Sequence, residues 1–214
     1  ILFPRLEKRL EMGHTTRLAR MHSWGTGRKR WAFLLTLVCG ISCTTDKRYD
    51  RNAELENRWI LGTHSLGLPG RNWSLLVDLP GFKMEKEAML PDGSATMVHA
   101  TNGSTHMVVS VFLESKPDLN STDGCKTYYW TKASQSPIPK SDVQHGTFGS
   151  MAAVHYLTRE FRGVPLMQKN INGYLYHDGV CVDVHLSKVH YQPTDESLFD
   201  AVLESVRISE HDPG

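Results

Sequence analysis

The chain contains the stretch Met107-Val108-Val109-Ser110-Val111-Phe112-Leu113, which is apolar on both faces of an extended backbone. A strand of this kind fits near the centre of a sheet, where both of its faces are covered. Asn102-Gly103 precedes the stretch and is typical of a tight reversal. We therefore place residues 107–113 in a central strand that is entered through a turn.

Three further strands are expected upstream of this central strand. Residues 73–79 largely alternate between apolar and polar side chains, and Pro80-Gly81 ends the run. Residues 82–90 and 95–100 flank Pro91-Asp92-Gly93, a turn in which glycine supplies a positive φ. Together with the central strand, these segments predict a meander of four strands.

A short helix and a second set of strands are expected downstream. Ser121-Thr122-Asp123 supplies candidate helix caps ahead of residues 125–133. The Asp178-Gly179 pair favours a hairpin between two of the later strands. The strands in this half of the chain are expected at residues 151–161, 171–176 and 180–186.

The last expected element is a helix that begins after Thr194, a good N-cap residue. Its apolar side chains form one stripe, as in a helix that packs on a sheet. The stripe consists of Leu198, Phe199, Val202, Leu203 and Val206. The order of the elements predicts an α+β fold, a mainly antiparallel β-sheet covered by helices.

The element order and a few residues resemble a known fold type. The strand that opens at Trp73, the meander, the Cys-x-Asp-x-His-x-Ser pattern of residues 181–187 and the closing helix resemble the α/β/α sandwich of the PsbP and Mog1 type. The resemblance covers about residues 72–208 and implies one domain of a bacterial lipoprotein. It implies a binding or assembly role and transfers no functional residue.

The composition is that of an ordinary globular protein. The 214 residues are 40% hydrophobic and 22% charged, which is enough apolar material for a core. Lys and Arg number 24 against 23 acidic residues, so no charge imbalance favours binding to nucleic acid. We therefore expect no nucleic-acid partner.

The beginning of the chain has the order of a secretory signal. Arg28-Lys29-Arg30 precedes an apolar stretch at 31–41, which is about half as long as a membrane-spanning helix needs to be. Small residues follow the apolar stretch, and Met21 would give the leader ordinary proportions. We interpret residues 1–20 as an overlong reading frame and residues 21–43 as a signal peptide.

The end of the leader resembles a bacterial lipobox. Cys43 follows Gly40-Ile41-Ser42, although lipoboxes favour Leu where this chain has Gly40. We expect lipidation of Cys43, and the alternative is that Cys43 is only a small residue near a cleavage site. A polar tether at 44–71, the domain at 72–208 and a tail at 209–214 would then follow. The expected location is the cell envelope, anchored by lipid and facing the periplasm or the exterior.

The two remaining cysteines of the exported domain are Cys125 and Cys181, since Cys39 would leave with the leader. Thiols that remain in an oxidising compartment are commonly joined, so a disulfide between them is expected. Two buried free thiols are the alternative. Because the cysteines lie in different predicted elements, the sequence does not test the geometry.

One local cluster is a candidate for metal binding or catalysis. Asp183, His185 and Ser187 share a strand face with Cys181, because side chains two residues apart point the same way. Zinc sites usually need three or four ligands, and no His-x-x-x-His or Cys-x-x-Cys pattern supplies the others. We therefore interpret His185 as a hydrogen-bonded structural histidine, with a weak alternative metal site at Asp183 and His185.

The motifs of common enzyme classes do not occur in the sequence. It contains no Gly-x-Ser-x-Gly elbow, no phosphate-binding loop and no dinucleotide fingerprint. We expect no cofactor and no catalytic residue. Two hypotheses follow: an exported, membrane-tethered binding or assembly module with an unknown protein partner, or a secreted enzyme or metal-dependent protein that uses Cys181, Asp183 and His185.

Overall fold

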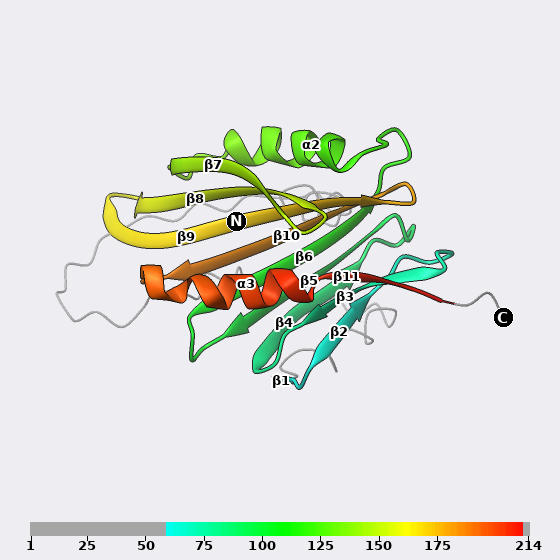
Figure 1. The fold of residues 1–214 in the computed structure, drawn as a ribbon, viewed down its shortest axis with the longest axis horizontal. Coiled ribbons are helices and arrows are strands. Elements are labelled where there is room, and N and C mark those ends of the chain that lie inside the picture. The colour runs from blue at the N-terminus through cyan, green and yellow to red at the C-terminus, as the bar shows by residue number, and fades with distance from the viewer. Residues whose placement is uncertain (1–58, 212–214) are drawn as a thin grey trace, which may run out of the picture. The chain divides into compact units, whose positions relative to one another are not determined.

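The structure is a computed structural model and describes residues 59–211. It contains two antiparallel sheets and two α-helices (Figure 1). In spatial order the large sheet consists of β1 (Trp59–Ile60), β4 (Phe82–Met89), β5 (Ala95–Asn102), β6 (Met107–Ser115), β10 (Val180–Val189), β9 (Val164–His177), β8 (Met151–Phe161) and β7 (Ser141–Phe148). The small sheet consists of β11 (Arg207–Glu210), β3 (Trp73–Asp78) and β2 (Thr63–Leu66).

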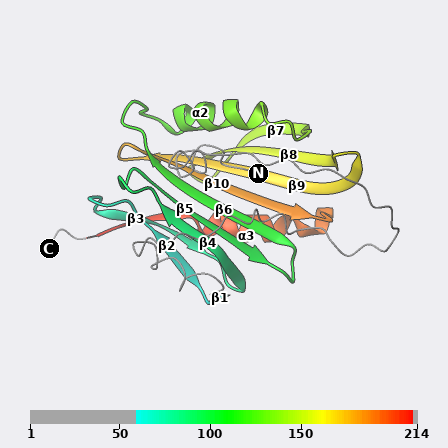
Figure 2. The ribbon, with the colours of Figure 1, turned by 180° about the vertical axis from the view of Figure 1, so that it is seen from behind.

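The two helices cover opposite faces of the large sheet. Helix α3 (Glu196–Ser205) packs with the small sheet on one face, where the main hydrophobic core lies. Helix α2 (Thr122–Ser134) lies on the other face, over β8, β9 and β10. In the view from behind, β4, β5 and β6 lie in front of α3 (Figure 2). The structure thus confirms the predicted α+β fold, a mainly antiparallel sheet covered by helices.

The central strand is β6, as its apolar sequence predicts. It pairs with β5 on one side and with β10 on the other. Val109, Val111 and Leu113 are fully buried in the core, and Phe112 is buried on the opposite face. Burial on both faces explains why this strand shows no apolar and polar alternation.

The closing helix is held by its apolar stripe. Phe199 is completely buried and Leu203 nearly so, and both belong to the core cluster. The helix begins at Glu196 rather than directly after Thr194, because a 3-10 turn at Pro193–Asp195 comes first. The Asp195 carboxylate accepts a hydrogen bond from the Gln192 backbone N–H at 2.8 Å and so closes that turn.

The fold begins earlier and ends later than the predicted domain of residues 72–208. Strands β1 and β2 lie inside the stretch assigned to a polar tether at 44–71, and β11 extends into the predicted tail. The physical reason is that Ile60, Leu66 and Leu68 are buried in the core, so this part of the stretch belongs to the packed domain. The predicted overlong start, the signal peptide and Cys43 lie outside the described residues. Within residues 59–211, no helix is long and apolar enough to cross a membrane.

Candidate functional site

The residues singled out on the late strand lie in line on β10, as their spacing predicts. Cys181, Asp183, His185 and Ser187 are all buried on the face that points away from the main core. Asp183 lies between Phe112 of β6 and Tyr174 of β9. The strand therefore presents a buried polar row toward the side of the sheet that carries α2.

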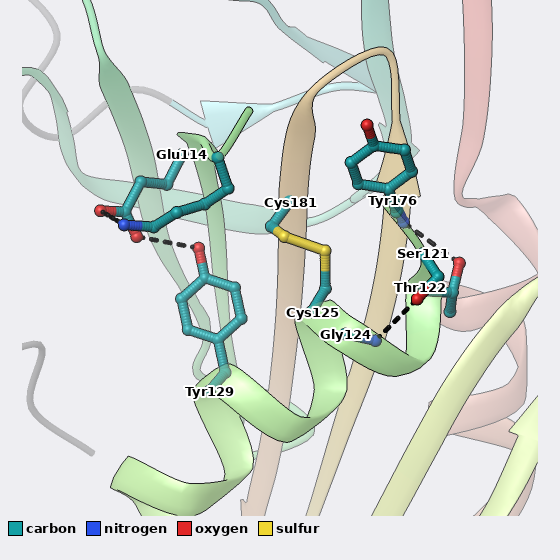
Figure 3. Close-up of a disulfide and its surroundings, with 9 residues drawn as sticks. Glu114, Ser121, Thr122, Gly124, Cys125, Tyr129, Tyr176 and Cys181 are labelled. Atoms are coloured by element: carbon teal, nitrogen blue, oxygen red, sulfur yellow. Dashed lines mark hydrogen bonds and ion pairs between the residues drawn. A yellow bond between two sulfur atoms is a disulfide. The ribbon is translucent and has the colours of Figure 1, made fainter. Parts of the chain in front are cut away.

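A disulfide connects this row to α2. Cys125 on the first turns of the helix is bonded to Cys181 on β10, with 5.6 Å between their Cα atoms (Figure 3). Both cysteines are completely buried. The pairing expected from the sequence is therefore present, and neither sulfur is a free thiol in this state.

Hydrogen bonds hold α2 at the same position on the sheet (Figure 3). The Ser121 hydroxyl caps the helix by accepting from the Gly124 backbone N–H at 3.1 Å. The Thr122 hydroxyl accepts from the Tyr176 backbone N–H of β9 at 3.2 Å. Further along, the Tyr129 hydroxyl donates to Oε2 of Glu114 at 3.1 Å. The helix is thus fixed by contacts to three strands of the large sheet, β6, β9 and β10.

Asp183 is a carboxyl group in an environment of low polarity. Its Oδ1 accepts a hydrogen bond from Nδ2 of Asn172 at 3.2 Å. Burial raises the pKa of Asp183 to about 7, against the weaker opposite effect of the Asn172 hydrogen bond. The carboxyl group is therefore partly protonated near neutral pH.

His185 is a neutral histidine at physiological pH. Burial lowers its pKa to about 3. The neighbouring His99 has its Nδ1 2.9 Å from the Ser110 hydroxyl, in the same row across β5 and β6. Within the described part of the chain, no hydrogen-bond partner is seen for Nε2 of His185, Oδ1 of Asn172 or the hydroxyl of Tyr174. A neutral, buried ring suits a structural role for His185, but the hydrogen bond expected for this histidine is not seen at Nε2.

The alternative metal or catalytic site would use Cys181, Asp183 and His185, and the disulfide makes Cys181 unavailable. A disulfide sulfur is not a thiolate, so Cys181 can act neither as a zinc ligand nor as a nucleophile while the bond exists. Asp183 and His185 remain, which is fewer than the three or four ligands of a zinc site. Among residues 59–211, no group of three or more His, Cys, Asp or Glu side chains could hold a metal ion.

The sequence did not predict a polar cavity on the other face of the sheet, beside the beginning of α3. The cavity has a volume of about 210 Å³. Its lining comes from four segments of the chain that are distant in sequence. The lining residues are Asp142, Gln144, His155, Tyr156, Leu157, Lys169, Tyr191 and Glu196.

A charged pair organises this cavity. The Lys169 ammonium group donates to both carboxylate oxygens of Glu196, and the Tyr191 hydroxyl donates to Oε1 of the same group. Burial alone would raise the pKa of Glu196, but the hydrogen bonds from Lys169 and Tyr191 outweigh it and hold the pKa below its usual value. Burial and the bond to Glu196 raise the pKa of Tyr191 to about 12. Burial lowers the pKa of His155 on the cavity wall.

A second cavity of about 370 Å³ lies at the other end of α3. It is lined by the turn between β7 and β8 and by the last residues of the helix. The lining residues are Phe148, Gly149, Ser150, Met151, Leu203, Glu204 and Val206. The two cavities therefore flank β7, one near each of its ends, on the side that faces α3.

Comparisons with known proteins were made by sequence and by structure, and a solved structure is similar to this chain. No protein-family model matches the sequence, and no curated protein is significantly similar to it. The chain is similar in structure to the cyanobacterial PsbP (CyanoP) from Synechocystis sp. PCC 6803, with 15% sequence identity and a TM-score of 0.44. The match covers 70% of this chain and 94% of the cyanobacterial one.

Proposed function

We propose that the chain is an exported, membrane-tethered binding or assembly module. The disulfide between Cys125 and Cys181 is the observation that supports export. Such bonds persist in oxidising compartments and are rare where cytosolic reductants keep thiols reduced. Both cysteines are completely buried, so the bond forms part of the packed interior between α2 and β10.

The tether is proposed from the sequence of the leader. Cys43 would be lipidated, and residues 44–58 would connect it to the first described strand at Trp59. A connection of this length would keep the domain within about 55 Å of the bilayer even when fully extended. The domain would then work at the surface of the cell envelope, facing the periplasm or the exterior.

A binding role is proposed over a catalytic one because of the state of the candidate residues. Cys181 is in a disulfide, and His185 is neutral and buried. The cavity that holds the pair Lys169 and Glu196 has about 210 Å³, which is small beside the pockets that usually hold ligands. The near balance of charges, +1 overall, favours a protein partner over nucleic acid.

The test is to express the full chain with its leader in a bacterial host and to follow its location and thiols. The expected result is a protein in the membrane fraction, labelled by a radioactive fatty acid, with Cys125 and Cys181 unreactive until reduction. Cys43→Ala should abolish labelling and release the protein, whereas Cys39→Ala, the matched control in the leader, should not. A wild-type protein found reduced in the cytoplasm would refute export, and unchanged labelling in Cys43→Ala would refute the lipid site.

A further inference from the structure

We propose that β7 is a site for strand addition, at which an extended segment of a partner protein pairs with the sheet as a ninth strand. This inference rests on the proposed binding function and names the class of partner. Among residues 59–211, strand β7 is the last strand of the large sheet and pairs only with β8 (Figure 1). An edge strand presents backbone N–H and C=O groups that an incoming strand can pair with.

Strand β7 is unusually open for part of a large sheet. Every residue from Asp142 to Thr147 is exposed, and the His145 ring contacts the Trp130 ring of α2 at 5.9 Å on one face. A register irregularity lies between Ser141 and Gln144, and Asp142 in that irregularity is bound to Arg159 at 2.6 Å. The regular part of the edge is therefore Gln144 to Phe148, which is long enough for a five-residue pairing.

This regular part lacks the charged and proline residues that keep sheet edges from pairing. The sequence Gln-His-Gly-Thr-Phe contains no Lys, Glu, Asp or Pro, which are residues that protect natural edges. The opposite edge differs, because β1 has only two residues and the adjacent β4 is rich in charge. Its charged residues are Lys83, Glu85, Lys86 and Glu87. The two edges of one sheet are thus protected to different degrees.

The geometry of the hairpin identifies the backbone groups that are available. The two-residue turn Gly149-Ser150 joins Phe148 to Met151, and the pair that closes such a turn exchanges its backbone hydrogen bonds. Since hydrogen-bonded and non-bonded pairs alternate, the N–H and C=O groups of His145 and Thr147 point away from β8. An added strand would pair with these two residues.

The occupant is an extended segment with a bulky side chain opposite Gly146. A Cβ atom placed on Gly146 would meet no atom within 4 Å, so the middle of the edge has open space on its α3 side. Side chains of directly opposed residues in neighbouring strands pack together, and a bulky residue would fill this space. The flanking cavities, one of mixed polar and apolar lining beside Phe148 and one charged beside Gln144, would receive the side chains two positions away.

A second copy of this chain fits the edge less well. On the side with the two cavities, the regular part of β7 carries Gln144, Gly146 and Phe148. A second β7 would bring a glycine to the centre, where the open space needs a side chain. Self-pairing would therefore leave the space beside Gly146 unfilled. This favours a partner segment of different sequence.

The experiment uses the full chain in detergent and a phage library of random linear peptides of about ten residues. Selected peptides should slow hydrogen exchange at the amides of His145 and Thr147. Thr147→Pro removes an outward N–H that β8 does not use, and it should weaken binding about tenfold or more. Thr147→Ala keeps the N–H and is the matched control, with binding close to that of the wild type.

A second variant tests the same edge without introducing a proline. Gly146→Val fills the open space without a clash, and valine favours a strand, so the variant should fold. Its affinity for the selected peptides should nevertheless fall at least about tenfold, because the space for the partner side chain is occupied. No selected peptide, peptides that protect other amides, or unchanged affinity in both variants would overturn the inference. A dimer through β7, seen by sedimentation and lost in Thr147→Pro, would overturn it in favour of a second copy. In each case, membrane association that depends on Cys43 would leave the proposed function standing.

Discussion

Asn172 donates a hydrogen bond from Nδ2 to Oδ1 of Asp183 at 3.2 Å, between two buried side chains on the neighbouring strands β9 and β10. This single donor does not offset the burial of the carboxyl group, whose pKa rises from 3.8 to about 7. The folded state therefore binds a proton more tightly than the unfolded chain does. The contribution of Asp183 to stability must then fall as the pH rises from about 4 to 7, and it stays low above that range.

Asp183→Asn should remove this pH-dependent loss, because the amide keeps an acceptor for Asn172 and never ionises. We expect the variant to gain stability over the wild type at pH 8 relative to pH 4, by an amount on the order of 4 kcal/mol at most. Urea unfolding of both proteins at the two pH values measures the gain. Asp118→Asn at an exposed position is the control. An equal effect of Asp183→Asn at both pH values would contradict a raised pKa.

The disulfide should stabilise the domain by restricting the unfolded chain. Its partners are 56 residues apart, for which the chain-entropy model gives roughly 4 kcal/mol before any native strain is subtracted. The double variant Cys125→Ala, Cys181→Ala should therefore melt at a lower temperature than the oxidised wild type. Reductant should lower the melting temperature of the wild type and leave that of the variant unchanged. Two reactive thiols in denatured, unreduced protein would show that the bond does not form.

Phe199 is the anchor of α3, and its ring is completely buried. Phe199→Ala should reduce the free energy of unfolding by about 3 to 5 kcal/mol, because it removes a large buried group and leaves a cavity. Phe161→Ala makes the same substitution at a ring that is 42% exposed and should cost much less. Chemical unfolding of the two variants checks the difference. Similar losses would place the helix elsewhere than on the core.

The pair Lys169 and Glu196 should contribute to stability in a pH-dependent way. The pKa of Glu196 is held below its usual value of 4.5, so the contribution is present above pH 4.5 and is lost as the pH falls through the folded-state pKa. Glu196→Gln should cost about 1 kcal/mol or less at pH 7, because the carboxylate is 43% exposed. The cost should shrink at pH 3. Glu160→Gln is the exposed control, and a cost that does not depend on pH would exclude the charged pair as its source.

The strands with strong patterns could be predicted from the sequence. Strand β8 has the bounds that were expected, and Asp178-Gly179 forms the turn between β9 and β10. The line of Asp183 and His185 on one face also follows from spacing alone. Each of these depends on residues that are close together in the chain, so local geometry is enough to place them.

The remaining strands and the polar cavity depend on tertiary contacts that no local sequence pattern indicates. Strand β7 is exposed on both faces, so its side chains show no alternation, and no local pattern predicts it. Strand β2 is only four residues long, and its buried positions, His64 and Leu66, include a polar side chain. The cavity around Lys169 and Glu196 joins segments that only tertiary packing brings together.

The strand order of the small sheet determines when this sheet can be completed during synthesis. Strand β3 lies between β2, which precedes it, and β11, whose Ile208 pairs with Leu75 from the far end of the chain. A polypeptide emerges with its N-terminus first, so one side of β3 has no partner until residues 207–210 have emerged. The layer that covers the core together with α3 is therefore completed only after β11 has been made, and a chain that stops before residue 207 cannot acquire this packing.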